Sequence, residues 1–222
     1  MDMINIYTGK GNLVPLKIYI SDRGYDYNKW IDDYKDKLLN IKNLYKGKLE
    51  ETIKIVNRYY GKEVLNANNC FISGSSLYTL FYFGKFTDID LFVVFNPKDF
   101  DLYIKDVIDY YGYVDYLYTD KNDKYFLIKL SNGVQVIFNK ELNKIFKNIN
   151  NGESVVNVLE KHFDFYHCCF CYYGDSLHAL NFCLYSIINK LLLWTETGID
   201  RIKVYKRVNK FVNDYGLNLN LT

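Results

Sequence analysis

One uninterrupted apolar run stands out in the pattern of apolar and polar positions. Residues 91–95 read LFVVF, directly follow Asp90 and precede the turn signal Asn96-Pro97. β-Branched and aromatic residues dominate this run, and such a run is typical of a strand that is covered on both faces. We therefore expect a buried strand here, and we expect the rest of the chain to be organised around it.

Apolar residues at helical spacing predict the helices. Through residues 28–60 they recur every three or four positions with Lys and Glu between them, which predicts an amphipathic helix with a break at Gly47. Similar patterns predict helices over residues 77–83, 100–111, 142–149, 154–159 and 177–193. A basic helix is expected over residues 199–213.

The remaining strands are predicted from alternating runs and turn residues. Asn132-Gly133 separates two such runs and is the strongest short-range hairpin signal, so we predict a β-hairpin over residues 125–139. Further strands are expected at residues 13–20, 114–118 and 163–172. Together these elements predict an α+β fold, in which a mixed sheet is flanked by helices and carries helical extensions at both ends.

The same elements predict three parts along the chain. Residues 1–62 would form an N-terminal strand and helical extension, and residues 63–175 the core. Residues 176–222 would form a C-terminal helical segment packed on that core. At 222 residues with 49% apolar residues, the chain is long enough to bury a substantial core.

Charge and hydropathy narrow the function classes. The formal net charge is only +2, so any nucleic-acid binding must come from a local basic patch. The best candidate for a membrane span, residues 182–194, is interrupted by Asn189 and Lys190, so no membrane segment is expected. The sequence also shows no signal peptide.

Cysteine usage predicts a reducing, cytoplasmic location. The chain has five cysteines, an odd number, and three of them crowd together at residues 168–171. This favours free thiols over disulfides. A zinc site built from these cysteines with His162 and His167 is disfavoured, because the Cys-x-x-Cys spacing is missing and successive strand residues face opposite sides.

The first candidate for chemistry is a small polar turn, Gly74-Ser75-Ser76, which follows the apolar pair Phe71-Ile72. Small residues there let backbone N–H groups face outward at the start of the helix predicted at residues 77–83. A helix N-terminus with free N–H groups and a serine hydroxyl is suited to phosphate. The turn therefore predicts a phosphate-binding site.

The second candidate is the acidic pair Asp88 and Asp90, which opens the buried strand. Residues two apart in a strand share a face, so the two carboxylates point the same way while Ile89 points into the core. Two neighbouring carboxylates repel each other, and a hard cation such as Mg²⁺ or Mn²⁺ removes that repulsion. The pair therefore predicts a divalent metal site.

In this order, the Gly-Ser turn, short helix and Asp-x-Asp strand resemble the nucleotidyltransferase superfamily with the DNA polymerase beta-like fold. A looser likeness over residues 70–210 is to uncharacterised nucleotidyltransferase-like proteins of phages and large DNA viruses. The resemblance implies that Gly74, Ser75 and Ser76 hold the triphosphate of a nucleotide such as ATP, and that Asp88 and Asp90 hold metal ions. It implies transfer of a nucleoside monophosphate to an acceptor hydroxyl on an RNA end, a small molecule or a protein.

The resemblance also implies a third carboxylate, on a strand of the hairpin. The matching strand, residues 134–138, has Gln135 where an acid is expected, and an amide neither neutralises a metal ion nor accepts a proton. Asp164 is the best substitute, since it enters an apolar run as Asp88 and Asp90 do. If that run is a strand parallel to and beside the hairpin sheet, all three carboxylates would ligate the metal and take part in catalysis.

The basic helix at residues 199–213 is the last candidate. Its apolar residues would dock the helix, and its outward cations would contact the triphosphate or an RNA backbone, with Tyr205 stacking on a base. The cations assigned to nucleotide binding are Arg201, Lys203 and Arg207. Because Gln135 replaces an acid, a second hypothesis remains: a degenerate protein of this fold that binds nucleotide, RNA or a protein partner without catalysis.

Overall fold

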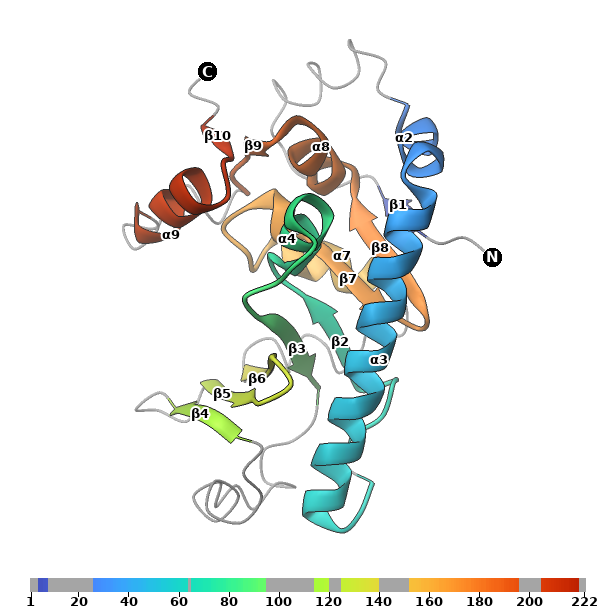
Figure 1. Cartoon of the computed structure of the whole chain (residues 1–222), viewed down its shortest axis with the longest axis vertical. Coiled ribbons are helices and arrows are strands. Elements are labelled where there is room, and N and C mark those ends of the chain that lie inside the picture. The colour runs from blue at the N-terminus through green and yellow to red at the C-terminus, as the bar shows by residue number, and fades with distance from the viewer. Residues whose placement is uncertain are drawn as a thin grey trace.

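A computed structural model describes most of the predicted core. The described residues are 4–7, 26–63, 65–94, 114–119, 125–139, 152–195 and 205–219. The strand predicted at residues 13–20 and the helices predicted at residues 100–111 and 142–149 lie outside them. Figure 1 shows the arrangement of the elements along and across the sheet.

The elements follow one another as strands and helices mixed along the chain. In order they are β1 (Ile4–Tyr7), α2 (Tyr27–Asp33), α3 (Lys35–Tyr60), β2 (Cys70–Ser73), α4 (Ser76–Phe83), β3 (Ile89–Val93), β4 (Val114–Thr119), β5 (Tyr125–Leu130), β6 (Val134–Asn139), α7 (Gly152–Glu160), the 3₁₀ turn η2 (Tyr166–Cys168), β7 (Phe170–Tyr173), β8 (Ser176–Leu180), α8 (Asn181–Asn189), β9 (Leu191–Leu192), α9 (Tyr205–Asn209), the π-helical turn η4 (Lys210–Asp214) and β10 (Asn218–Leu219).

One mixed sheet of eight described strands forms the centre of the molecule. Its order is β1-β8-β7-β2-β3-β6-β5-β4, and β9 pairs with β10 in a separate two-stranded ladder. The pairs β1–β8 and β3–β6 are parallel, and the other neighbours in the sheet are antiparallel. The expected α+β class with a mixed sheet flanked by helices is confirmed, and β3 lies inside the sheet between β2 and β6.

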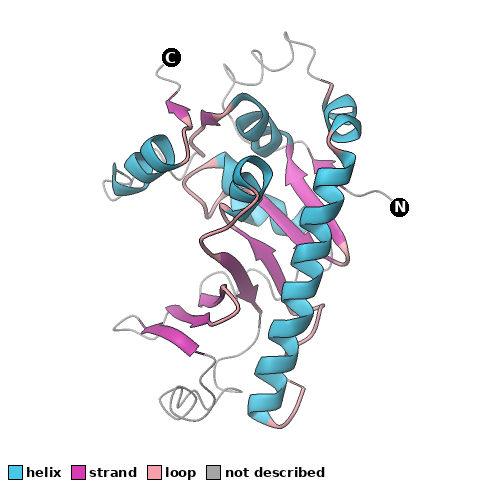
Figure 2. Cartoon of the chain, in the orientation of Figure 1, coloured by secondary structure: helices cyan, strands magenta, loops and turns pink. Residues whose placement is uncertain are grey.

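Alternation along β7 shows how the two faces of the sheet are covered. Phe170 and Tyr172 face α3, where their rings lie 5.9 and 6.0 Å from the ring of Tyr45. Cys171, between them, points the other way, and its thiol donates to the carbonyl of Gly152 at the start of α7. Helix α3 therefore covers one face and α7 the other, and Figure 2 shows α3 and α4 in front of the strands.

The long N-terminal helix breaks at a different residue from the one predicted. Helix α3 continues through Gly47, and the break falls at Tyr34, between α2 and α3. A glycine inside a helix costs only about 1 kcal/mol relative to alanine, so the buried face of α3 outweighs it. Leu38, Tyr45 and Leu49 are among the α3 residues in that face.

Two predictions near the C-terminal part of the sheet are wrong. The segment predicted as one helix at residues 177–193 divides into β8, α8 and β9. The segment predicted as a strand at residues 163–172 has only an isolated bridge at Phe165, then the turn η2, and becomes β7 at Phe170. Both runs are largely apolar, so their periodicity does not distinguish a buried strand from a buried helix.

Other predictions hold. The hairpin β5–β6 forms around Gly133, which has φ +82°. The five cysteines are all free and buried, as expected of core thiols. Among the described helices, none is both long and apolar enough to cross a lipid bilayer.

Candidate active site

The polar turn between β2 and α4 is anchored on two sides. The hydroxyl of Ser73 donates to the carbonyls of Phe170 at 2.6 Å and Cys168 at 3.2 Å. On the other side, the hydroxyl of Ser76 lies 3.0 Å from that of Tyr45, in the core. These buried hydrogen bonds fix the backbone of the two residues between them, Gly74 and Ser75.

The three candidate phosphate residues are therefore not equivalent. Ser76 is 2% exposed and its hydroxyl is engaged with Tyr45. Ser75 is the N-cap residue of α4, is partly exposed, and makes no side-chain capping hydrogen bond. The hydroxyl of Ser75 and the N–H groups at the start of α4 are thus the groups placed to meet a ligand, whereas Ser76 anchors the helix.

Gly74 lies directly against the carboxylate of Asp90. It has φ +92°, and a Cβ atom built on it would stand 2.4 Å from Oδ2 of Asp90. Any other residue would collide with the carboxylate and strain the backbone. The close approach follows from sheet register, because Ser73 pairs with Asp90 across β2 and β3. The turn and the acidic pair therefore form one site.

The acidic pair stands at the start of β3, as predicted. Ile89 is fully buried, and its N–H donates to the carbonyl of Gly133 in the hairpin turn at 3.1 Å. Burial, and then the charge of Asp88, raise the pKa of Asp90 to about 7, while Lys210 and Arg207 act in the opposite direction. Carboxylate oxygens are the ligands that a hard divalent cation prefers, and such an ion would offset the part of this shift that comes from Asp88.

A lysine that the sequence reasoning missed completes this side of the site. Nζ of Lys129 lies 2.8 Å from Oδ1 of Asp88. Lys129 pairs in register with Gln135, and Gln135 pairs with Asp90. The sequence does contain a sign of this role. Lys129 is the one charged residue in the apolar run of β5, and the predicted hairpin places it opposite Gln135.

Asp164 lies elsewhere than expected. It precedes the turn η2, and the strand that follows, β7, pairs with β2 and β8 and not with the hairpin. The parallel crossover beside the hairpin sheet is therefore wrong. The carboxylate is 4% exposed, and its Oδ2 accepts from Nη1 of Arg207 at 2.5 Å. Within the described ranges, no three His, Cys, Asp or Glu side chains are grouped closely enough to hold one metal ion.

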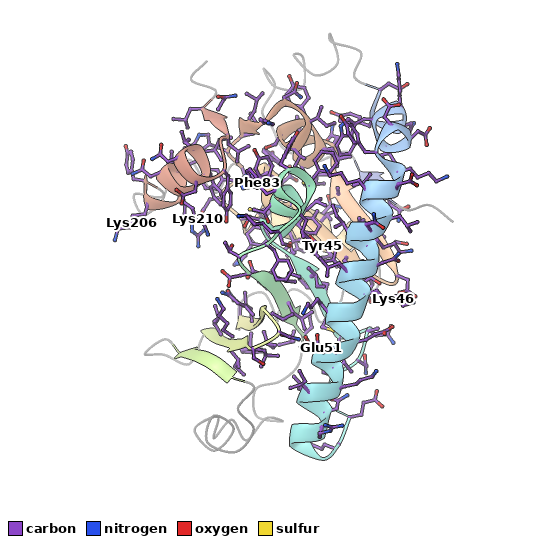
Figure 3. The ribbon with its side chains drawn as sticks, viewed as in Figure 1. Tyr45, Lys46, Glu51, Phe83, Lys206 and Lys210 are labelled. Atoms are coloured by element: carbon purple, nitrogen blue, oxygen red, sulfur yellow. The ribbon has the colours of Figure 1, made fainter. Side chains whose placement is uncertain are left out.

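The C-terminal segment brings two cations toward the acidic pair. The charges of Lys210 and Arg207 both lower the pKa of Asp90. In Figure 3, Lys210 lies on the side of the segment nearer to α4, and Lys206 lies farther out. Of the other cations predicted to bind nucleotide, Arg201 and Lys203 lie outside the described residues.

Tyr215 fixes this segment against the site. Its hydroxyl lies 3.4 Å from Oγ1 of Thr87, the residue before Asp88, and its carbonyl accepts from the hydroxyl of Tyr78 at 2.9 Å. The ammonium of Lys210 stands 5.4 Å from the centre of the Tyr215 ring. The cations therefore come from a segment docked on both α4 and the loop that leads into β3.

The long helix α3 contacts both the turn between β2 and α4 and the hairpin turn. Near Tyr45, which holds Ser76, the ammonium of Lys48 donates to the carbonyl of Asn132 in the hairpin turn at 2.7 Å. In Figure 3, Tyr45 lies on the side of α3 that faces the sheet and Lys46 on the outer side. One helix thus positions both the turn beside Asp90 and the hairpin that carries Gln135 and Lys129.

No protein-family model matches the chain, and no curated protein matches it in sequence. Solved structures with a similar fold include the Thermotoga maritima CCA-adding enzyme complexed with tRNA, at 14% identity and a TM-score of 0.46, covering 69% of this chain and 35% of the enzyme. A CCA-adding enzyme in complex with CTP matches at 15% identity and a TM-score of 0.47, covering 89% of this chain and 42% of that chain.

A further similar structure is a tRNA-processing enzyme in its apo form, at 14% identity and a TM-score of 0.48, covering 79% of this chain and 44% of that chain. This chain thus spans less than half the length of each of these three proteins.

Proposed function

We propose that this protein is a nucleotidyltransferase that depends on a divalent metal ion. It would move a nucleoside monophosphate from a nucleoside triphosphate to an acceptor hydroxyl. The observation that carries the proposal is the contact between Gly74 and the carboxylate of Asp90, with no room for a Cβ atom between them. This contact brings the N-terminus of α4, which we propose binds phosphate, next to the acidic pair, which we propose holds the metal ion, and a metal-bound triphosphate requires such an arrangement.

The phosphate end of the nucleotide would lie on the turn. The N–H groups at the start of α4 and the hydroxyl of Ser75 donate to the β- and γ-phosphate oxygens. Lys210 and Arg207 would add positive charge near Asp90. Arg201 and Lys203 are proposed as further contacts to the triphosphate or to an RNA backbone.

Asp88 and Asp90 would hold Mg²⁺ or Mn²⁺ through their carboxylate oxygens. The bound ion would supply positive charge that offsets the charge of the phosphates. The acceptor oxygen would form a bond to the α-phosphorus as the bond from that phosphorus to the leaving pyrophosphate oxygen breaks, and the hydroxyl proton would pass to solvent water. The residues of this chain would bind the nucleotide, orient its phosphates and neutralise their charge. The acceptor would be an RNA end, a small molecule or a protein.

Asp164 acts through Arg207 in this proposal. Its carboxylate is buried and forms an ion pair with the guanidinium, while 62% of the Arg207 side chain is exposed. Arg207 is thereby oriented next to Asp90 without losing its access to a ligand. Asp164 is a positioning residue, in place of the third metal ligand expected from the sequence.

The test is incubation of the protein with each nucleoside triphosphate labelled at the α-phosphorus, with Mg²⁺ or Mn²⁺ and a pool of total RNA and protein. We expect covalent label on one acceptor class with the wild-type chain and none with Asp90→Asn. Ser75→Ala should weaken triphosphate binding by about tenfold, because hydrogen bonds to charged groups contribute roughly 1.5–3 kcal/mol. Equal labelling by wild type and Asp90→Asn would contradict the metal-site assignment.

A second candidate is a protein of the same fold that binds nucleotide, RNA or a partner without transfer. Gln135 favours it, since this neutral amide lies beside Asp90 in the sheet. The labelling experiment separates the two. Triphosphate binding that needs Ser75, without label on any acceptor, would support the binding protein.

A further inference from the structure

We propose that the acidic site holds one divalent cation, and that the ammonium of Lys129 supplies the positive charge that a second cation would otherwise bring. This inference rests on the proposed function, because it assigns a metal ion to Asp88 and Asp90. It concerns how the chain itself sets the number of ions.

Sheet register places the residues of this proposal in one row. Asp90 on β3 pairs with Gln135 on β6, and Gln135 pairs with Lys129 on β5. Neighbouring strands are about 4.8 Å apart, so Lys129 starts about 10 Å from Asp90. Its long side chain returns across Gln135 and ends with Nζ 2.8 Å from Oδ1 of Asp88. The ammonium thus lies against Asp88, the first acid of the pair, and not in solvent beyond the hairpin.

The pairing is partly buried on both sides. The side chain of Lys129 is 35% exposed and that of Asp88 is 28% exposed. The next residue, Leu130, is 3% exposed and points into the core, so the alternation of β5 directs Lys129 to the face that carries the acids. Loss of solvent strengthens the interaction relative to an ion pair on an open surface.

Charge then limits the number of metal ions. Asp88 and Asp90 bring two negative charges, Lys129 already offsets one of them, and Gln135 brings none. Arg207 and Lys210 add further positive charge near Asp90. Within the described residues, no third acid joins the pair in a group that could hold one ion. One dication on these three side chains leaves a small excess of positive charge, whereas two dications side by side would leave a much larger one and repel each other strongly.

The experiment counts bound Mn²⁺ by electron paramagnetic resonance, in which free Mn²⁺ gives the signal, and titrates Mn²⁺ alone into the full chain. We expect one ion per wild-type chain. Lys129→Met should tighten Mn²⁺ binding by about tenfold, because Asp88 loses its competing cation. Lys129→Glu should raise the count to two ions per chain, since a carboxylate replaces the ammonium.

Lys46→Met is the matched control. Lys46 is also a lysine in an ion pair, 3.7 Å from Asp175, but it lies on the outer side of α3 (Figure 3). We expect its Mn²⁺ count and affinity to equal those of wild type. Thermal melting curves of every variant, recorded without Mn²⁺, identify any that fail to fold, and for such a variant Lys129→Gln is measured instead.

The outcomes separate this inference from the proposed function. Two ions on the wild-type chain, or unchanged count and affinity in the folded Lys129 variants, would overturn the role of Lys129 and leave the metal site in place. No Mn²⁺ binding by wild type or by any Lys129 variant would overturn both. A purely structural ion pair predicts lower melting temperatures for the Lys129 variants with no change in Mn²⁺ binding.

Discussion

The hydroxyl groups of Tyr45 and Ser76 lie 3.0 Å apart in the core, and they connect the middle of α3 to the first residue of α4. Burial raises the pKa of Tyr45 far above its ordinary value, so the phenol stays protonated and can donate. The N–H groups at the start of α4, which we propose bind phosphate, therefore depend on a contact inside the core.

Replacing this tyrosine tests that dependence. We expect Tyr45→Phe to lower the free energy of unfolding by about 1–3 kcal/mol, because the Ser76 hydroxyl is left buried without this partner. Triphosphate affinity should fall as well, since the turn is held less firmly. Urea unfolding and calorimetric titration measure the two effects. Tyr34→Phe, at a residue that is 41% exposed, is the control and should change neither.

The contact between Gly74 and Asp90 is tested with two glycines. Gly74 and Gly84 both have positive φ, at +92° and +64°, but only at Gly74 would a Cβ atom meet another group within 4 Å. Gly84→Ala should therefore lower the free energy of unfolding by about 1–2 kcal/mol, through backbone strain alone. Gly74→Ala should lower the free energy of unfolding, measured with urea, by more than Gly84→Ala does, and it should abolish triphosphate binding. Equal effects of the two substitutions would show that Asp90 is not pressed against the turn.

Asp90→Asn should separate stability from activity. The raised pKa of Asp90 means that the folded chain prefers the protonated carboxyl, so stability falls as the pH rises from 3.8 to about 7. The loss is about 1.4 kcal/mol per pH unit within that range. In the absence of metal at pH 8, Asp90→Asn should melt at a higher temperature than wild type, and it should have no transferase activity. A lower melting temperature would argue against the burial of this charge.

The pair Arg207 and Asp164 calls for a double-mutant cycle. Arg207→Met leaves the buried Asp164 carboxylate without this partner, so we expect a loss of about 1–3 kcal/mol in urea unfolding. Asp164→Asn in the same chain should recover part of that loss. Transferase activity should fall in both single variants, and Asp164→Asn should have no further effect on activity once Arg207 is absent. If the losses of activity in the two single variants add up in the double variant, Asp164 has a role in activity that is independent of Arg207.

His167 should make the fold sensitive to acid. The side chain is fully buried among Tyr78, Phe165 and Phe211, and burial lowers its pKa to about 3. A base whose pKa is depressed on folding stabilises the fold above its unfolded pKa near 6.5 and loses that contribution as the pH falls toward 3. We expect His167→Phe to flatten the decline of melting temperature between pH 6.5 and 4.5. An unchanged decline would place the acid sensitivity elsewhere.

The sequence predicted the parts of the fold that depend on local signals. The Asn132-Gly133 turn defined a hairpin, and the order of turn, helix and acidic strand brought Gly74, Asp88 and Asp90 into one site. These features depend on turn chemistry and on the two-residue period of a strand, both of which are visible in a single segment.

The rest depends on pairing between distant segments. The apolar run after Asp164 suggests a place beside the hairpin, yet that run pairs with β2 and β8. The pattern over residues 177–193 predicts one helix, but only Asn181–Asn189 are helical, and the residues before them form β8 between β1 and β7. A run buried on all sides has no polar face to reveal its partners, so neither outcome could be derived from periodicity.

The interior position of β3 has a consequence for motion. Its backbone is paired with β2 on one side and β6 on the other, so exposing it requires separation of two neighbours. Arg207 and Lys210 stand instead on α9 and η4, each of five residues, whose opening breaks far fewer hydrogen bonds. The acidic half of the site therefore stays formed through fluctuations that release the basic half. If the protein binds a triphosphate as proposed, we expect the ligand to meet carboxylates already in place and to order the cations around it.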